Sequence, residues 1–214
     1  MSTQTIHIRA SLRAASGERA HDAVARWSGV LLFLVGAEFM TAIMLAASLA
    51  PNYDIAGGAI SDLGVVDQTA LLFNASLVFI GAANLAVGYL LYRSHRRAWI
   101  LGVFTLAGLG AAGAGIFPLD TGDAHSIFAL LAFVFFNVEA IACATLVSGP
   151  MRWVSTIAGA VGLAFVALMV IGDSGNPAVF GPIGHGGAER MIVYPAMIWL
   201  MAFGGYLLAV GEDR

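Results

Sequence analysis

Side chains that could do chemistry lie in short segments between long apolar stretches of this chain. They bring hydroxyl, carboxylate and imidazole groups, and six are predicted as catalytic residues: Ser61, Asp62, Asp120, His125, His185 and Glu189. Carboxylates and imidazoles bind divalent ions such as zinc; if such an ion is bound, its predicted ligands are Asp120, His125 and His185. The same groups could act as general acids and bases next to a lipid headgroup.

The spacing of these residues carries no local signature such as His-Glu-x-x-His. Ser61 and Asp62 lie in an apolar segment, residues 59–64, that is predicted to dip toward the membrane surface. His185 and Glu189 are four residues apart and would share one helical face, but three neighbouring glycines disfavour helix at His185. A structural polar network that closes one end of a helix bundle is the competing interpretation, and the more frequent one.

Arg190 is the one arginine predicted to lie on the outer side of the membrane. A buried arginine needs a carboxylate partner or an anionic ligand. The candidate partners are Asp62, Asp120 and Glu189, and a salt bridge to one of them is predicted. A phosphate-bearing lipid headgroup is the functional alternative, with Arg190, Asn74 and Tyr194 as the predicted ligand-binding residues.

A deeper polar layer is predicted inside the apolar stretches, formed by Glu38, Asn84, Asn137 and Glu139. An ionised carboxylate near the middle of a bilayer costs at least about 2.5 kcal/mol, so both glutamates are predicted to be protonated or hydrogen-bonded inside the bundle. Asn137 and Glu139 are two residues apart and therefore face different sides of a helix. Hydrogen bonding between helices is the favoured role; a proton or ion pathway using Glu38 and Glu139 is the alternative.

Four other acidic residues are assigned to ordinary roles. Asp54, Asp67 and Asp173 lie in loop regions and are predicted to be surface residues. Asp123 directly precedes an apolar stretch and is predicted to be a helix N-cap.

Long apolar segments must position all of these groups. The 214 residues are 59% hydrophobic and 11% charged, with a mean hydropathy of +0.86. A bilayer core needs about 20 apolar residues per helix, and an open strand would leave its backbone unpaired in lipid. The sequence therefore predicts an all-α polytopic membrane protein, a bundle of six transmembrane helices. The predicted spans are 27–49, 69–92, 98–117, 125–147, 153–172 and 188–210.

Arginine placement predicts the orientation of this bundle, since the chain has no lysine. With six spans, nine arginines fall on one side and only Arg190 on the other. The nine are Arg9, Arg13, Arg19, Arg26, Arg93, Arg96, Arg97, Arg152 and Arg214. The positive-inside rule then places both termini in the cytoplasm, with tails at residues 1–26 and 211–214 around a transmembrane domain at 27–210.

The third span carries a run of small residues at positions 108–115, GLGAAGAG. Small residues let helices approach closely in lipid. This span is therefore predicted to be the central, protein-buried helix.

Several function classes are excluded or disfavoured by composition. Basic residues are too few for a nucleic-acid-binding protein. The single cysteine, Cys143, provides no disulfide framework and no cysteine metal site. Haem would require histidines facing each other within spans, whereas His125 and His185 lie at predicted span ends.

Several motifs resemble the family of membrane proteins with domain of unknown function 998. The most specific are SDLG at 61–64 and FPLD at 117–120, followed by His125. Supporting motifs are YD at 53–54, FN at 73–74, and GAER at 187–190 with Tyr194, Pro195 and Trp199. The resemblance implies a prokaryotic six-helix inner-membrane protein without an established activity. A similarity to eukaryotic multi-pass proteins of glycolipid remodelling favours a lipid-related role, but no catalytic residue carries over from it.

Three hypotheses follow. The first is a pocket at the outer end that binds or processes a lipid headgroup or small polar ligand, whose enzyme version is a hydrolase or transferase, metal-assisted if an ion is bound. The second is a proton- or ion-coupled small-molecule transporter. The third is a structural or partner-binding membrane protein. Membrane lipids are the expected partners in the first hypothesis.

Overall fold

The computed structural model describes residues 3–212, and the side chains of residues 23–209. Within these residues the chain forms helices and no strands, so the all-α prediction is confirmed. The six long helices are α1 (Thr3–Leu49), α2 (Ala70–His95), α3 (Ala98–Ile116), α4 (Asp123–Cys143), α5 (Pro150–Asp173) and α6 (Gly184–Glu212). Three short 3-10 helices occupy connections: η1 (Ile60–Gly64), η2 (Leu119–Thr121) and η3 (Pro177–Ile183).

All six long helices are long and apolar enough to cross a membrane, as predicted. Their ends differ from the predicted spans by four residues or more at three places. The fourth helix ends at Cys143 and not near 147, because the chain turns toward Gly149, which has a φ of 65°. The sixth begins at Gly184, so the helix doubted at His185 does form. The first begins at Thr3, which makes most of the predicted tail a continuation of α1. Residues 1–2 and 213–214 of the two predicted tails lie outside the described residues.

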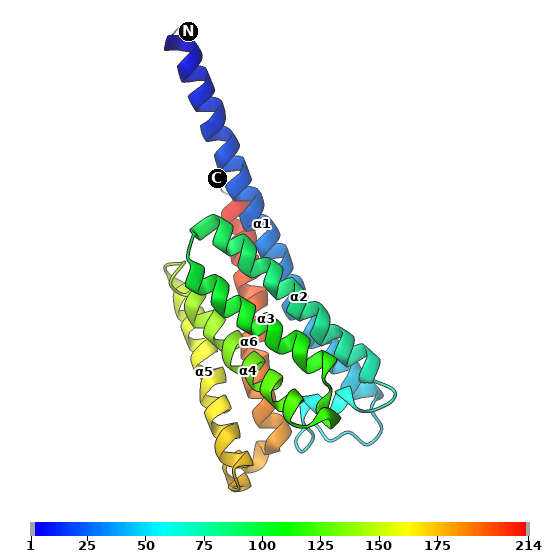
Figure 1. Ribbon diagram of the computed structural model, residues 1–214. Coiled ribbons are helices and arrows are strands. Elements are labelled where there is room, and N and C mark those ends of the chain that lie inside the picture. Colours follow the sequence, from blue (N-terminus) through cyan, green and yellow to red (C-terminus); the bar gives the residue numbers. More distant parts are fainter. Residues whose placement is uncertain (1–2, 213–214) are drawn as a thin grey trace.

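The helices form a closed ring in which each packs against its neighbours in the sequence, and α6 packs against α1 (Figure 1). Glycines allow the close approaches. A Cβ added to Gly81 of α2 would lie 2.6 Å from the carbonyl oxygen of Gly108 in α3. One added to Gly204 of α6 would lie 2.6 Å from the carbonyl oxygen of Gly29 in α1. Within the apolar stretch of α3, 50% of the residues are buried inside the protein, the largest share among the six helices. This agrees with the prediction of a central, protein-buried helix.

Two polar contacts involving the deep glutamates connect neighbouring helices. Ser76 of α2 donates a 2.9 Å hydrogen bond to Glu38 of α1. Asn84 of α2 donates to Glu139 of α4 over 2.5 Å, and Glu139 is fully buried. These contacts are the interhelical hydrogen bonds expected of polar residues in lipid.

Asn137 faces another side of α4, as its spacing from Glu139 predicts. Its amide donates to the carbonyl oxygen of Ile192 in α6, over 3.1 Å. A Cβ at Gly162 of α5 would overlap the Asn137 amide, so glycine makes room for this contact. Asn137 therefore joins the helices that surround the site described next.

Candidate functional site

The site lies at the end of the bundle opposite the two chain termini (Figure 1). This end, here called the polar end, carries η1, η2 and η3 in the connections between helices. Most of the side chains predicted to do chemistry lie there.

Arg190, near the start of α6, holds the loop between α1 and α2. Its Nη1 donates to the carbonyl oxygens of Ile55 (2.8 Å), Gly58 (3.2 Å) and Gly186 (2.8 Å). Its Nη2 donates to the Tyr53 hydroxyl over 2.7 Å, and the guanidinium lies 5.6 Å from the centre of the Tyr53 ring. The residue is 7% exposed. Arg190 thus docks the loop on α6 through charge-assisted hydrogen bonds to the backbone.

The predicted salt bridge of Arg190 is wrong. Asp62, Asp120 and Glu189 all lie outside ion-pair distance of its guanidinium, whose partners are backbone carbonyls and a phenol. Carbonyl oxygens carry enough negative charge to satisfy a buried guanidinium, and they do so here without a carboxylate. The same contacts use both terminal nitrogens of the guanidinium, Nη1 and Nη2, to hold the loop.

Tyr53 links this contact to the next segment of the loop. Burial raises the pKa of its phenol, although the hydrogen bond from Arg190 opposes that shift. The phenol is therefore protonated at neutral pH, and it donates to the carbonyl oxygen of Ala59 over 2.6 Å. It accepts from Arg190 and donates to the residue that precedes η1.

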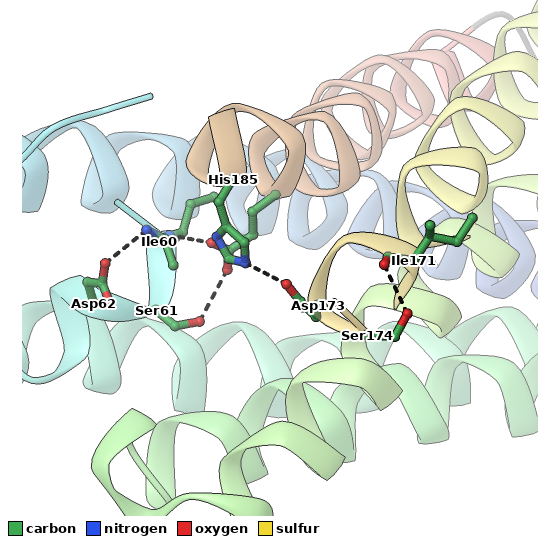
Figure 2. A network of polar contacts seen from close by, with 9 residues as sticks. Ile60, Ser61, Asp62, Ile171, Asp173, Ser174 and His185 are labelled. Carbon is green, nitrogen blue, oxygen red and sulfur yellow. Dashed lines mark hydrogen bonds and ion pairs between the residues drawn. The ribbon is translucent and has the colours of Figure 1, made fainter. Parts of the chain in front are cut away.

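Glu189, the neighbour of Arg190, positions η1. Its carboxylate accepts the backbone N–H of Ile60 (2.5 Å) and the hydroxyl of Ser61 (3.2 Å), and the residue is 3% exposed. Asp62 accepts the N–H of Ala59 over 2.9 Å, so its side chain serves the turn itself. Figure 2 shows Ser61 and Asp62 on opposite sides of this turn. Glu189 therefore fixes the Ser61 hydroxyl, while Asp62 has a structural contact.

His125, in the first turn of α4, has one ring nitrogen fixed and one without a partner. Its Nδ1 lies 2.8 Å from the carbonyl oxygen of Phe117. A carbonyl oxygen can only accept, so Nδ1 carries the hydrogen, and in the neutral ring Nε2 has a lone pair. The residue is 4% exposed, and Nε2 is buried with no hydrogen-bond partner. His125 thus offers an acceptor that the protein does not use.

His185 and Asp173 lie in contact across the gap between α6 and α5. The distance from His185 Nε2 to Asp173 Oδ1 is 3.2 Å, and both side chains are well exposed, at 38% and 56%. Figure 2 shows this pair beside Ser61, with Asp173 at the end of α5. The pair forms the solvent-accessible edge of the site, and the prediction of Asp173 as a plain surface residue missed it.

Two adjoining cavities lie between these groups. The larger, here called the vestibule, has a volume of about 430 Å³ and lies among α4, α5 and α6. The smaller, with about 50 Å³, lies deeper in the bundle and is almost wholly apolar. Both are lined by Ser61, His125, Ala129, Phe133, Glu189 and Ile192. The volume of the vestibule falls in the range typical of small-molecule sites.

The vestibule has a polar layer above an apolar one. The polar layer consists of Ser61, His125, Ser126, Asp173, His185 and Glu189. The apolar layer consists of Ala129, Leu130, Phe133, Val166, Met169, Val170 and Ile192. Val166 lies seven residues below Asp173 on α5, which is about 10 Å along a helix. Leu130 and Val170 are 47% and 54% exposed, so the apolar layer reaches the outer surface of the bundle.

Three predicted site residues have other positions. Asp120 is exposed and lines neither cavity. Asn74 donates to the carbonyl oxygen of Gly64 over 2.8 Å and thereby ties η1 to α2. Tyr194 packs against the main apolar core. These residues support the walls of the site or lie outside it.

The predicted metal ligands Asp120, His125 and His185 are not brought together. Among the residues the structure describes, no group of three or more His, Cys, Asp or Glu side chains is placed to hold a metal ion. His125 is held by Phe117 and His185 by Asp173, while Asp120 lies on the surface.

The prediction of Asp123 as the N-cap of the fourth helix is wrong. Asp123 is the first residue of α4, follows the N-cap Gly122, and makes no capping hydrogen bond.

Comparison with known proteins gives one family match. A family model described as "Protein of unknown function (DUF998)" matches residues 30–206. Neither the curated proteins nor the solved structures contain a significant match to this chain. The match reaches all six helices, α1 and α6 in part, and includes every residue of the site.

Proposed function

We propose, for a chain that belongs to the DUF998 family of proteins of unknown function, that it binds a membrane amphiphile in the vestibule. The polar end of this amphiphile lies among Ser61, His125 and Glu189. Its hydrocarbon chain lies along the apolar layer between α4 and α5.

The observation that carries this proposal is the unpartnered Nε2 of His125. A buried polar atom without a hydrogen bond costs about 1–3 kcal/mol, so such atoms are rare unless a ligand or water completes them. The ring is held by the Phe117 carbonyl, and it lines both cavities. A ligand that donates an O–H or N–H to Nε2 would recover this cost.

The shape of the vestibule favours an amphiphile over a wholly polar ligand. Its polar groups are confined to the layer nearest the polar end, and the wall beneath them is hydrocarbon. Leu130 and Val170 are exposed at the outer surface of the bundle, where a membrane-spanning helix meets lipid. A hydrocarbon chain could therefore enter sideways from the bilayer without crossing water.

A chemical step on the bound molecule is a second candidate function. The Ser61 hydroxyl donates to the Glu189 carboxylate, and a hydroxyl paired with a potential base is the arrangement that nucleophilic catalysis requires. Such a hydrolase or transferase would use the same vestibule. Transport is less favoured, because Glu38 and Glu139 line neither cavity and each is hydrogen-bonded to a neighbouring helix.

The charge pattern of the loops completes the proposal. Nine of the ten arginines fall on the side of the termini, which favours cytoplasmic termini in an inner membrane and a vestibule on the outer leaflet. Arg190, the exception, has its charge stabilised by hydrogen bonds to carbonyl oxygens inside the protein.

The test of amphiphile binding blocks the junction of the two cavities. In Ala129→Trp the indole would fill the space that both cavities share. We expect dodecanol to bind the amphipol-held Ala129→Trp variant at least about tenfold more weakly than it binds wild type. The ligand would lose the apolar contacts at the junction of the cavities, which costs more than about 1.4 kcal/mol. Isothermal titration measures this affinity.

The matched control is Ala86→Trp, on an exposed face of α2 outside both cavities. It should bind dodecanol as wild type does. Ser126→Trp fills the vestibule from an exposed position and replaces Ala129→Trp if that variant unfolds. Equal affinities for the vestibule variants and Ala86→Trp would refute the proposed function.

A further inference from the structure

We infer that the polar end of the amphiphile is a cationic amine, an inference that rests on the proposed function. We draw this inference from the hydrogen-bond donors, acceptors and charged groups that line the vestibule. It distinguishes an amine from a phosphate, the two charged groups most common at the polar ends of membrane amphiphiles.

The vestibule presents acceptors. In the neutral imidazole, Nε2 of His125 has a lone pair, because Nδ1 donates to the carbonyl oxygen of Phe117. The Ser61 hydroxyl donates its hydrogen to Glu189, and the lone pairs of its oxygen remain available as acceptors. Only one oxygen of Asp173 pairs with His185. A bound group rich in N–H donors would satisfy all three residues.

The charges of the vestibule are also those of a cation site. Asp173 and Glu189 bring two carboxyl groups, and both oxygens of Glu189 accept hydrogen bonds, from the backbone N–H of Ile60 and the Ser61 hydroxyl. No arginine lines the vestibule among the described residues, and the chain has no lysine. The nearest guanidinium along α6, that of Arg190, is occupied by Ile55, Gly58, Gly186 and Tyr53.

A phosphate would meet the opposite situation. Its oxygens would face the carboxyl groups of Asp173 and Glu189 with no guanidinium or ammonium donor to bind them, and the His185 imidazole is already paired with Asp173. An ammonium group placed between Glu189 and Asp173 gains charge-assisted hydrogen bonds instead. Among the described residues, the other ionisable groups that line the vestibule are His125 and His185, and His185 remains paired with Asp173 at the exposed edge.

The experiment compares three probes with one chain length: dodecylamine, dodecanol and dodecyl phosphate. They are titrated into the amphipol-held wild-type protein and into Asp173→Asn. We expect dodecylamine to bind about tenfold or more tightly than dodecyl phosphate, the effect of one charge-assisted hydrogen bond. Asp173→Asn should weaken dodecylamine about threefold to tenfold more than it weakens dodecanol, because Asp173 is a partly exposed charge.

Asp67→Asn is the matched control, because Asp67 is an exposed acid of the same end that lines neither cavity. It should bind all three probes as wild type does. Glu189→Gln is a second test of charge; Asp173→Asn decides the result if Glu189→Gln does not fold.

The outcomes separate the two proposals. If dodecylamine is not the tightest of the three probes, the amine inference is overturned while amphiphile binding stands. If no probe shows binding that Ala129→Trp or Ser126→Trp abolishes, amphiphile binding itself fails. Loss of dodecylamine affinity in Asp67→Asn equal to that in Asp173→Asn would also overturn the inference, because it would indicate a general charge effect.

Discussion

Replacing Arg190 by alanine is expected to lower the stability of the protein more than any other single arginine replacement in the described bundle. The change leaves the carbonyl oxygens of Ile55, Gly58 and Gly186 and the hydroxyl of Tyr53 without their buried donor. Each hydrogen bond to a charged group contributes about 1.5–3 kcal/mol, so a loss of at least about 3 kcal/mol is expected. For a chain of this size that lowers Tm by about 6–12 °C. Thermal unfolding in detergent measures it.

Arg93→Ala provides a closely matched control. Arg93 also donates to a tyrosine hydroxyl, that of Tyr89 over 3.3 Å, and lies 5.8 Å from the ring centre. It is exposed, so its loss should cost less than about 1 kcal/mol. Similar Tm values for the two variants would show that Arg190 does not hold the loop. In Arg190→Ala, dodecanol affinity should also fall, since the loop carries Ser61 into the vestibule.

Gly110→Ala should produce the second large loss of stability. A Cβ at this position would overlap the backbone nitrogen of Ala132 and lie 2.9 Å from its Cα. Because the obstructing atoms belong to the backbone of α4, the two helices must separate, and overpacking of this kind costs about 1–3 kcal/mol. The thermal unfolding assay should report a Tm lower by about 2–12 °C.

Gly102→Ala, on the same helix, isolates the effect of close packing. A Cβ at Gly102 has no neighbouring atom within 4 Å. Alanine is a better helix former than glycine, so this variant should be as stable as wild type or gain up to about 1 kcal/mol. A similar loss in both variants would contradict the account of α3 as a helix packed through its glycines.

The helices could be predicted from the sequence because lipid demands apolar segments of a fixed length. Their ends could not, since these depend on tertiary contacts. The early start of α6 is an example. Gly186 donates its N–H to the carbonyl oxygen of Ala56 over 2.9 Å, and Arg190 binds the Gly186 carbonyl one turn later. Contacts with a loop about 130 residues away in sequence thus support helix where glycine alone disfavours it.

The positions of part of the predicted site set could be inferred from the sequence, but the contacts could not. Ser61, His125, His185 and Glu189 do line one vestibule, as their positions at helix ends suggest. The partners of Arg190 were missed because backbone carbonyls have no sequence signal. Asp173 was missed because an acid at the end of an apolar segment resembles any surface acid until its partner, His185, is placed beside it.

The most direct measurement of amphiphile binding is a crystal structure of the protein grown with dodecylamine that carries a bromine at the end of its chain. Anomalous scattering locates the bromine independently of the protein. We expect a bromine peak on the apolar layer beside Leu130 and Val166, with the amine within hydrogen-bond distance of Glu189 or Asp173. Bromine peaks only on other lipid-facing surfaces, with the vestibule filled by water or by protein side chains, would contradict the account.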